Sequence, residues 1–129
     1  MHKNALSPEG IDISVRTKYL QEQSDPDQDR YVFAYTIDIE NKGSKPVKLV
    51  SRHWIITDDN DKVEEVKGSG VVGKQPMIQP GQAFQYTSGA ILETGFGTMQ
   101  GSYEMLTEDG EKFAAVIPPF LLSRPLSVH

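Results

Sequence analysis

The chain of 129 residues contains no cysteine, which excludes disulfides, thiolate metal ligands and a cysteine nucleophile. It also lacks any apolar run near the ~20 residues that a membrane-spanning helix needs. The first ten residues, MHKNALSPEG, lack the apolar core of a secretory signal. These absences predict a cytoplasmic protein that is not inserted into a membrane.

Basic residues and histidines are scarce. The 13 Lys and Arg are outnumbered by 18 Asp and Glu, which gives a net charge of −5. Because the basic residues are scattered, no stripe can follow a phosphate backbone, and we expect no nucleic-acid binding. His2 and His129 lie at the ends of the chain, and His53 stands alone in a predicted strand. We therefore expect no catalytic residues, no enzymatic activity and no cofactor.

Helical periodicity is absent as well, and period-two alternation of apolar residues takes its place. Residues 31–41 show it most clearly, with Phe33, Tyr35 and Ile37 on one face; such alternation is typical of half-buried strands. Strands are predicted at 11–19, 31–41, 47–58, 62–66, 84–91, 101–106 and 112–117, the last ended by Pro118-Pro119. With turn signals every ~8–12 residues, this pattern predicts an all-β, immunoglobulin-like antiparallel sandwich of about seven to eight strands.

The same pattern predicts one domain spanning residues 1–129, with frayed termini at 1–9 and 124–129. Trp54 stands at the spacing expected for the core indole of an immunoglobulin-like sandwich, and Tyr103 precedes Met105 by two residues. Tyr103 is therefore predicted to be a tyrosine-corner residue, with Met105 in place of a cysteine. The alternative is that these are ordinary core residues.

One glycine-rich segment matches two phosphate-binding patterns, GxGxxG and GxxxxGK. Both patterns need a helix that begins at the motif, so that its N-terminus faces the phosphate. Here Gln75 replaces the Ser or Thr that would hold magnesium, and Pro76 and Pro80 oppose a helix. A structural loop at 68–73 is predicted. The alternative is nucleotide or anion binding through Gly68, Gly70, Gly73 and Lys74.

An oxygen-rich segment, Asp58-Asp59-Asn60-Asp61, lies between two predicted strands. It lacks the glycine and the terminal glutamate of an EF-hand loop. We predict a solvated hairpin tip, because Asn and Asp tolerate the backbone of tight turns. No metal site is expected. The alternative is a weak divalent-cation site that uses Asp58, Asp59 and Asp61.

The order and spacing of these motifs resemble the ApaG family over nearly the whole chain. The resemblance rests on residues 33–37, 51–58, 68–73, 75–76, 80–81, 86–89, 99–103 and 117–120. It implies a fibronectin type III-like sandwich and an association with cobalt resistance and magnesium efflux. It also implies protein interaction, because the same domain occurs in eukaryotic F-box proteins and in a polymerase-delta-interacting protein.

These observations together predict a non-enzymatic protein-binding module that is linked to cobalt and magnesium homeostasis indirectly, through a protein partner that the sequence does not name. The unpaired edges of a sandwich are natural sites for strand addition. A homo-oligomer formed through those sheet edges is therefore a further expectation.

Overall fold

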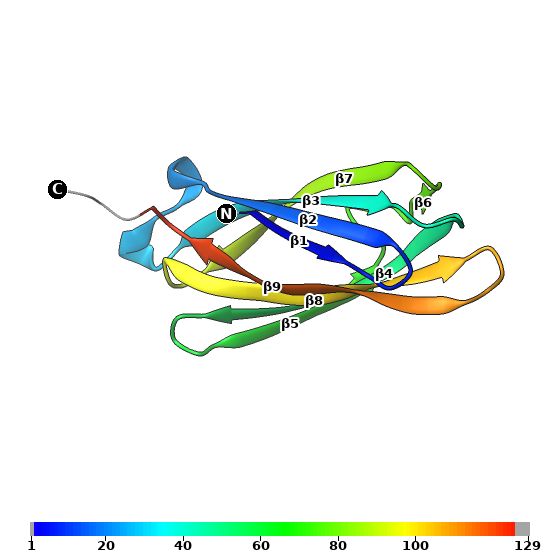
Figure 1. The fold of residues 1–129 in the computed structure, drawn as a ribbon. Coiled ribbons are helices and arrows are strands. Elements are labelled where there is room, and N and C mark those ends of the chain that lie inside the picture. Colours follow the sequence, from blue (N-terminus) through cyan, green and yellow to red (C-terminus); the bar gives the residue numbers. More distant parts are fainter. Residues whose placement is uncertain (1, 126–129) are drawn as a thin grey trace.

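The computed structural model describes residues 2–125, which form nine strands in two stacked antiparallel sheets (Figure 1). One sheet has the order β1-β2-β3-β7: His2–Leu6, Ile11–Tyr19, Tyr31–Asn41 and Ala83–Leu92. The other has the order β5-β4-β8-β9: Val63–Ser69, Val47–Asp58, Phe96–Thr107 and Lys112–Ser123, with β6 (Met77–Ile78) beside β4. The predicted all-β sandwich is confirmed, with nine strands rather than seven to eight.

The helical content of this part of the chain is small. Two short 3-10 turns, η1 (Gln21–Gln23) and η2 (Pro26–Gln28), lie in the loop between β2 and β3. Within residues 2–125 no helix is long and apolar enough to cross a membrane.

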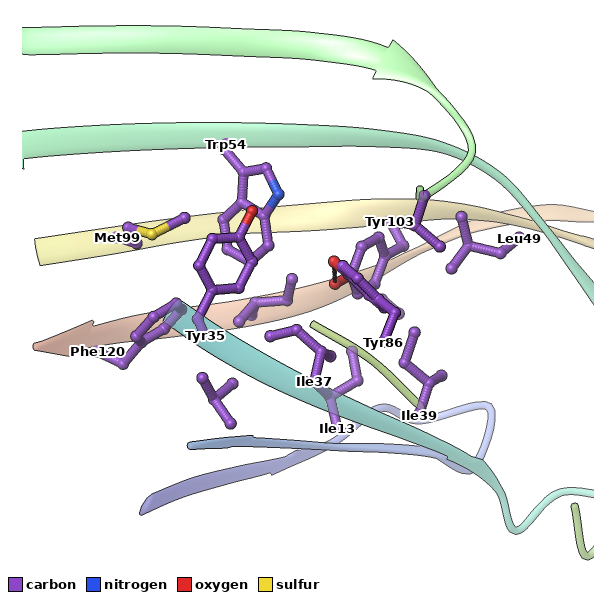
Figure 2. Close-up of a cluster of buried hydrophobic side chains, with 14 of the residues drawn as sticks. Ile13, Tyr35, Ile37, Ile39, Leu49, Trp54, Tyr86, Met99, Tyr103 and Phe120 are labelled. Atoms are coloured by element: carbon purple, nitrogen blue, oxygen red, sulfur yellow. Dashed lines mark hydrogen bonds between the residues drawn. The ribbon is translucent and has the colours of Figure 1, made fainter. Parts of the chain in front are cut away.

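The core lies between the two sheets and follows the alternation seen in the sequence. Phe33, Tyr35 and Ile37 of β3 point inward and are buried. Trp54 of β4 is only 2% exposed, and its ring meets Tyr35 and Phe120 edge-on, with centroids 5.5 and 5.9 Å apart (Figure 2). The indole therefore packs between the sheets, as the sequence predicts.

Tyr103 is buried on β8, but it does not form a tyrosine corner. That motif requires the hydroxyl to bond the backbone a few residues upstream. Instead the Tyr103 hydroxyl shares a hydrogen bond with the Tyr86 hydroxyl of β7, in the opposite sheet (Figure 2). Burial raises the pKa of both tyrosines, so both stay protonated at neutral pH and join the two sheets.

The last strand differs most from the prediction. β9 does not end at Pro118-Pro119 but continues to Ser123, and β8 begins at Phe96 rather than Gly101. Between Met99 and Gly101 the pairing of β8 with β9 shifts register, which marks a bulge or irregularity. Prolines are tolerated there because β9 is an edge strand, where a missing N–H leaves no ladder partner unpaired.

The N-terminal prediction also needs correction. Residues 2–6, expected to fray, form β1 and pair antiparallel with β2, from His2 opposite Arg16 to Leu6 opposite Asp12. Residues 124–125 lie outside the strands, but Arg124 is held in place, because its N–H donates to the Gly95 carbonyl at 2.9 Å. Residue 1 and residues 126–129 are outside the described residues.

Candidate functional site

The glycine-rich segment forms a strand end and a tight turn. Gly68 belongs to β5, which runs on to Ser69, beyond its predicted end. Val71 and Lys74 exchange two backbone hydrogen bonds, of 2.8 and 2.9 Å, around a two-residue turn. Val72 and Gly73 both have positive φ, 43° and 78°, as a type I′ hairpin turn requires. In the described chain no helix begins at Gly73 or Lys74, as the sequence predicts.

The backbone amides of this turn serve the fold. The N–H of Gly70 donates to the carbonyl of Val50 at 2.8 Å, and the N–H groups of Val71 and Lys74 close the turn. A phosphate site needs such amides to point at the anion. This geometry favours the structural interpretation of the motif.

Arg52 is a residue that sequence reasoning missed. It lies on β4 opposite Gly68, and its Nη1 donates to the carbonyls of Ser69 and Gly70 at 3.1 and 2.9 Å. A Cβ at Gly68 would lie 2.7 Å from the guanidinium carbon. The absence of a side chain at Gly68 thus leaves space for the Arg52 guanidinium, which connects β4 to the loop. This contact becomes visible only when the pairing of β4 with β5 is known.

The acidic hairpin tip is held by one of its own side chains. Asp58 is 7% exposed, and its Oδ1 accepts hydrogen bonds from the backbone N–H groups of Asn60 and Lys62 at 2.8 and 3.0 Å. Asp59 and Asp61 are exposed. Across the described residues, no group of three or more His, Asp or Glu side chains is arranged to hold a metal ion.

Cobalt or magnesium is therefore expected to bind no more tightly than the millimolar range, as weak oxygen sites do. Asp58 is engaged in the turn, which leaves two solvated carboxylates. Calorimetric titration of the metal-free chain measures the affinity, with the Asp59→Asn, Asp61→Asn double variant as control. Micromolar binding that this double variant abolishes would contradict the expectation.

His53 lies on the outer face of β4, on the opposite side from Trp54, as alternation predicts. Its Nε2 is 3.3 Å from Oε1 of Glu65 on β5, and the same oxygen is 3.3 Å from Lys67 Nζ. Lys67 first, and His53 to a lesser extent, lower the pKa of Glu65. The Glu65 and Lys67 side chains are exposed, the His53 ring is half-buried, and its Nε2 atom is shielded from solvent without a hydrogen-bond partner among the described residues.

The open edge of β7 is the most distinctive surface of the molecule. β7, Ala83–Leu92, has ten residues, AFQYTSGAIL, with no charge and no proline. It pairs with β3 without a register shift, and it ends its sheet (Figure 1). Within residues 2–125 no strand pairs with its other side.

The other three sheet edges carry features that block strand addition. β1 has only five residues, β5 carries Glu64, Glu65 and Lys67, and β9 contains Pro118-Pro119. Short length, charge and proline are the means by which natural proteins protect edges from pairing. β7 has none of them, and its edge is therefore the candidate binding site.

The hydrogen-bonding groups of that edge can be assigned from the ladder. The N–H of Asn41 donates to the carbonyl of Gln82 at 2.9 Å, and the pairing continues as Ile39 opposite Phe84 and Ile37 opposite Tyr86. Bonded pairs alternate in an antiparallel ladder, so even-numbered residues of β7 bond to β3. The outward N–H and C=O groups belong to Ala83, Gln85, Thr87, Gly89 and Ile91.

Comparisons with known proteins agree with the motifs. The ApaG domain family model matches residues 21–107. Protein ApaG of Thiobacillus denitrificans is 62% identical over 119 residues, covering 92% of this chain and 94% of that protein, and Protein ApaG of Dechloromonas aromatica is 57% identical over the same shares. The crystal structure of the putative ApaA protein from Bordetella pertussis superposes with a TM-score of 0.90 at 50% identity, covering 95% of this chain and 100% of that one. The chain therefore belongs to the ApaG family.

Proposed function

We propose that this chain is a protein-binding module that accepts an extended segment of another polypeptide along the open edge of β7. The unprotected edge carries the proposal. It offers a continuous row of N–H and C=O groups to an incoming strand, the arrangement used in strand addition. Main-chain hydrogen bonds supply the affinity in this mode, and side chains on alternate positions supply the specificity.

The side chains at this edge define the kind of segment that fits. The odd-numbered residues of β7 have uncharged side chains on the solvent face. The largest apolar one, Ile91, is 54% exposed. Gln85 is held by Asp38, to whose Oδ1 its Nε2 donates at 2.6 Å, and Thr87 shares a hydrogen bond of 2.8 Å with Thr36. A partner strand of uncharged, β-prone residues matches this surface, because an incoming charge would lose solvation without gaining an opposite charge.

The family resemblance supplies the setting. Because bacterial members are associated with cobalt resistance and magnesium efflux, we place the module in divalent-cation homeostasis. It acts in the cytoplasm, without catalysis, through its protein partner rather than by holding the metal itself. The metal titration described above separates these two routes.

Amide hydrogen exchange measured by NMR tests the binding mode residue by residue. In dilute protein, Gln85, Thr87, Gly89 and Ile91 are expected to exchange faster than Phe84, Tyr86, Ser88 and Ala90, whose amides bond to β3. A strand added by a partner protects the first group and leaves the second unchanged. Protection that appears elsewhere, with the fast group still fast, contradicts the proposal.

Two matched variants test whether a protein partner binds at the β7 edge. Thr87→Lys places a charge on the edge, whereas Thr36→Lys places the same charge one strand further in, on the same face, and breaks the same Thr36–Thr87 hydrogen bond. Proteins captured from cell extract by the wild-type chain are expected to be retained by Thr36→Lys and lost by Thr87→Lys. Equal retention by both variants counts against the β7 edge.

A further inference from the structure

We infer that the strand best matched to the β7 edge is β7 of a second copy of this chain, which gives a two-fold dimer. This inference rests on the proposed function, because both use the same row of backbone groups. The two copies would form one continuous sheet with the order β1-β2-β3-β7-β7-β3-β2-β1.

The register follows from the outward-pointing residues. These residues, 83, 85, 87, 89 and 91, are symmetric about Thr87. A two-fold axis at Thr87 sets Thr87 opposite its own copy, Gln85 opposite Gly89, and Ala83 opposite Ile91. Each outward N–H and C=O of one strand then meets a partner on the other, in the antiparallel pattern of bonded pairs.

The side chains are complementary in size and charge in this register. The long Gln85 lies opposite Gly89, where a Cβ would meet nothing closer than an ordinary contact of 3.5 Å with the Phe33 carbonyl. The exposed Ile91 lies opposite the small Ala83, so apolar surface is covered. No charge of β7 faces another. Glu93, just beyond the strand, is paired with Lys62.

A second copy also has an energetic advantage over a flexible segment. β7 is already extended and held by β3 along its whole length, so pairing does not incur the ordering cost of a disordered peptide. The contact is isologous, and it uses the full edge on both copies. Pairing through β7 therefore stops at a dimer rather than growing into a fibre.

Sedimentation velocity over a range of concentrations tests the inference on the full-length chain. The wild type is expected to show a monomer–dimer equilibrium. Thr87→Lys sets two ammonium groups directly opposite each other at the two-fold axis, and is expected to raise the dissociation constant by about tenfold or more. Thr36→Lys, the matched control, keeps the wild-type equilibrium because it lies one strand away from the contact.

Mixing two variants tests the register. Thr87→Lys and Thr87→Glu are each expected to stay monomeric, but an equimolar mixture is expected to form a heterodimer, because opposite charges then meet at the axis. A mixture that gains no affinity over either variant alone overturns the Thr87-centred register. Thermal melts of both variants establish that they are folded.

The remaining outcomes separate this inference from the proposed function. A wild-type chain that stays a single copy up to about 1 mM overturns the dimer. If Thr87→Lys then still loses a captured protein that Thr36→Lys keeps, the strand-accepting edge stands and its occupant is a different protein. If the wild type is a monomer and both variants capture the same proteins as the wild type, both the dimer and the strand-accepting edge are overturned. A dimer equally stable in Thr87→Lys uses another surface and also overturns the inference.

Discussion

Replacing Trp54 by alanine is expected to lower the free energy of unfolding by about 3–5 kcal/mol, the range for large aromatic truncations in cores. The indole is buried between the sheets and makes edge contacts with Tyr35, Tyr103 and Phe120. Those three rings come from three different strands. Alanine leaves a cavity at their meeting point, and the surrounding strands cannot close it without breaking their ladders. Urea denaturation measures the loss.

Trp54→Phe is the matched control for this change. The Trp54 Nε1 is buried without a hydrogen-bond partner among the described residues, so phenylalanine gives up no such bond. It keeps a ring in the site and is expected to lose clearly less stability than alanine. A loss under about 1 kcal/mol for Trp54→Ala is the size of a surface substitution and would contradict the burial of the indole.

Alternation predicts the bounds of three of the four inner strands. β2, β3 and β4 begin and end at the residues expected from the sequence. β2 and β3 bury apolar side chains at alternate positions, so local pattern and tertiary burial agree there, whereas in β4 the alternation is interrupted by a register shift between Leu49 and Ser51. β8 and β9 were predicted too short, because Gly95, Gly97 and Pro118-Pro119 are usual signals of loops. The pairing of β8 with β4 and of β9 with β8 overrides those signals.

Much less of the candidate site is predictable from the sequence. The absence of charge in residues 83–92 is visible in the sequence, but it has meaning only for a strand that ends a sheet. Strand order is set by contacts between distant segments, such as Ile37 opposite Tyr86, and local pattern carries no information about them. Arg52 was missed for the same reason, because its partners Ser69 and Gly70 belong to another strand end.

The glycine motif gives the sharpest contrast between two single substitutions. At Gly70, φ is +60° and a Cβ would lie 2.1 Å from the carbonyl oxygen of Lys74. At Gly73, φ is +78° but a Cβ would meet nothing within 4 Å. Gly73→Ala therefore carries only the left-handed backbone cost of about 1–2 kcal/mol. Gly70→Ala adds a backbone clash to that cost and is expected to lose about 3 kcal/mol or more.

Thermal and urea unfolding of Gly70→Ala and Gly73→Ala measure this difference in stability. A separate NMR titration of the wild type and Gly73→Ala with pyrophosphate or ATP measures whether the loop binds an anion. Since the Gly70, Val71 and Lys74 amides are bonded within the protein, we expect only weak shifts that disappear at physiological salt, as attraction to an exposed lysine does. Gly73→Ala leaves those amides in place, so its shifts should match the wild type. Saturable micromolar binding centred on residues 69–74, abolished by Gly73→Ala in a chain that is still folded at the temperature of the titration, would instead make the motif a phosphate site. A large stability loss in Gly70→Ala, together with the absence of specific anion binding by the wild type, is the result that a structural turn requires.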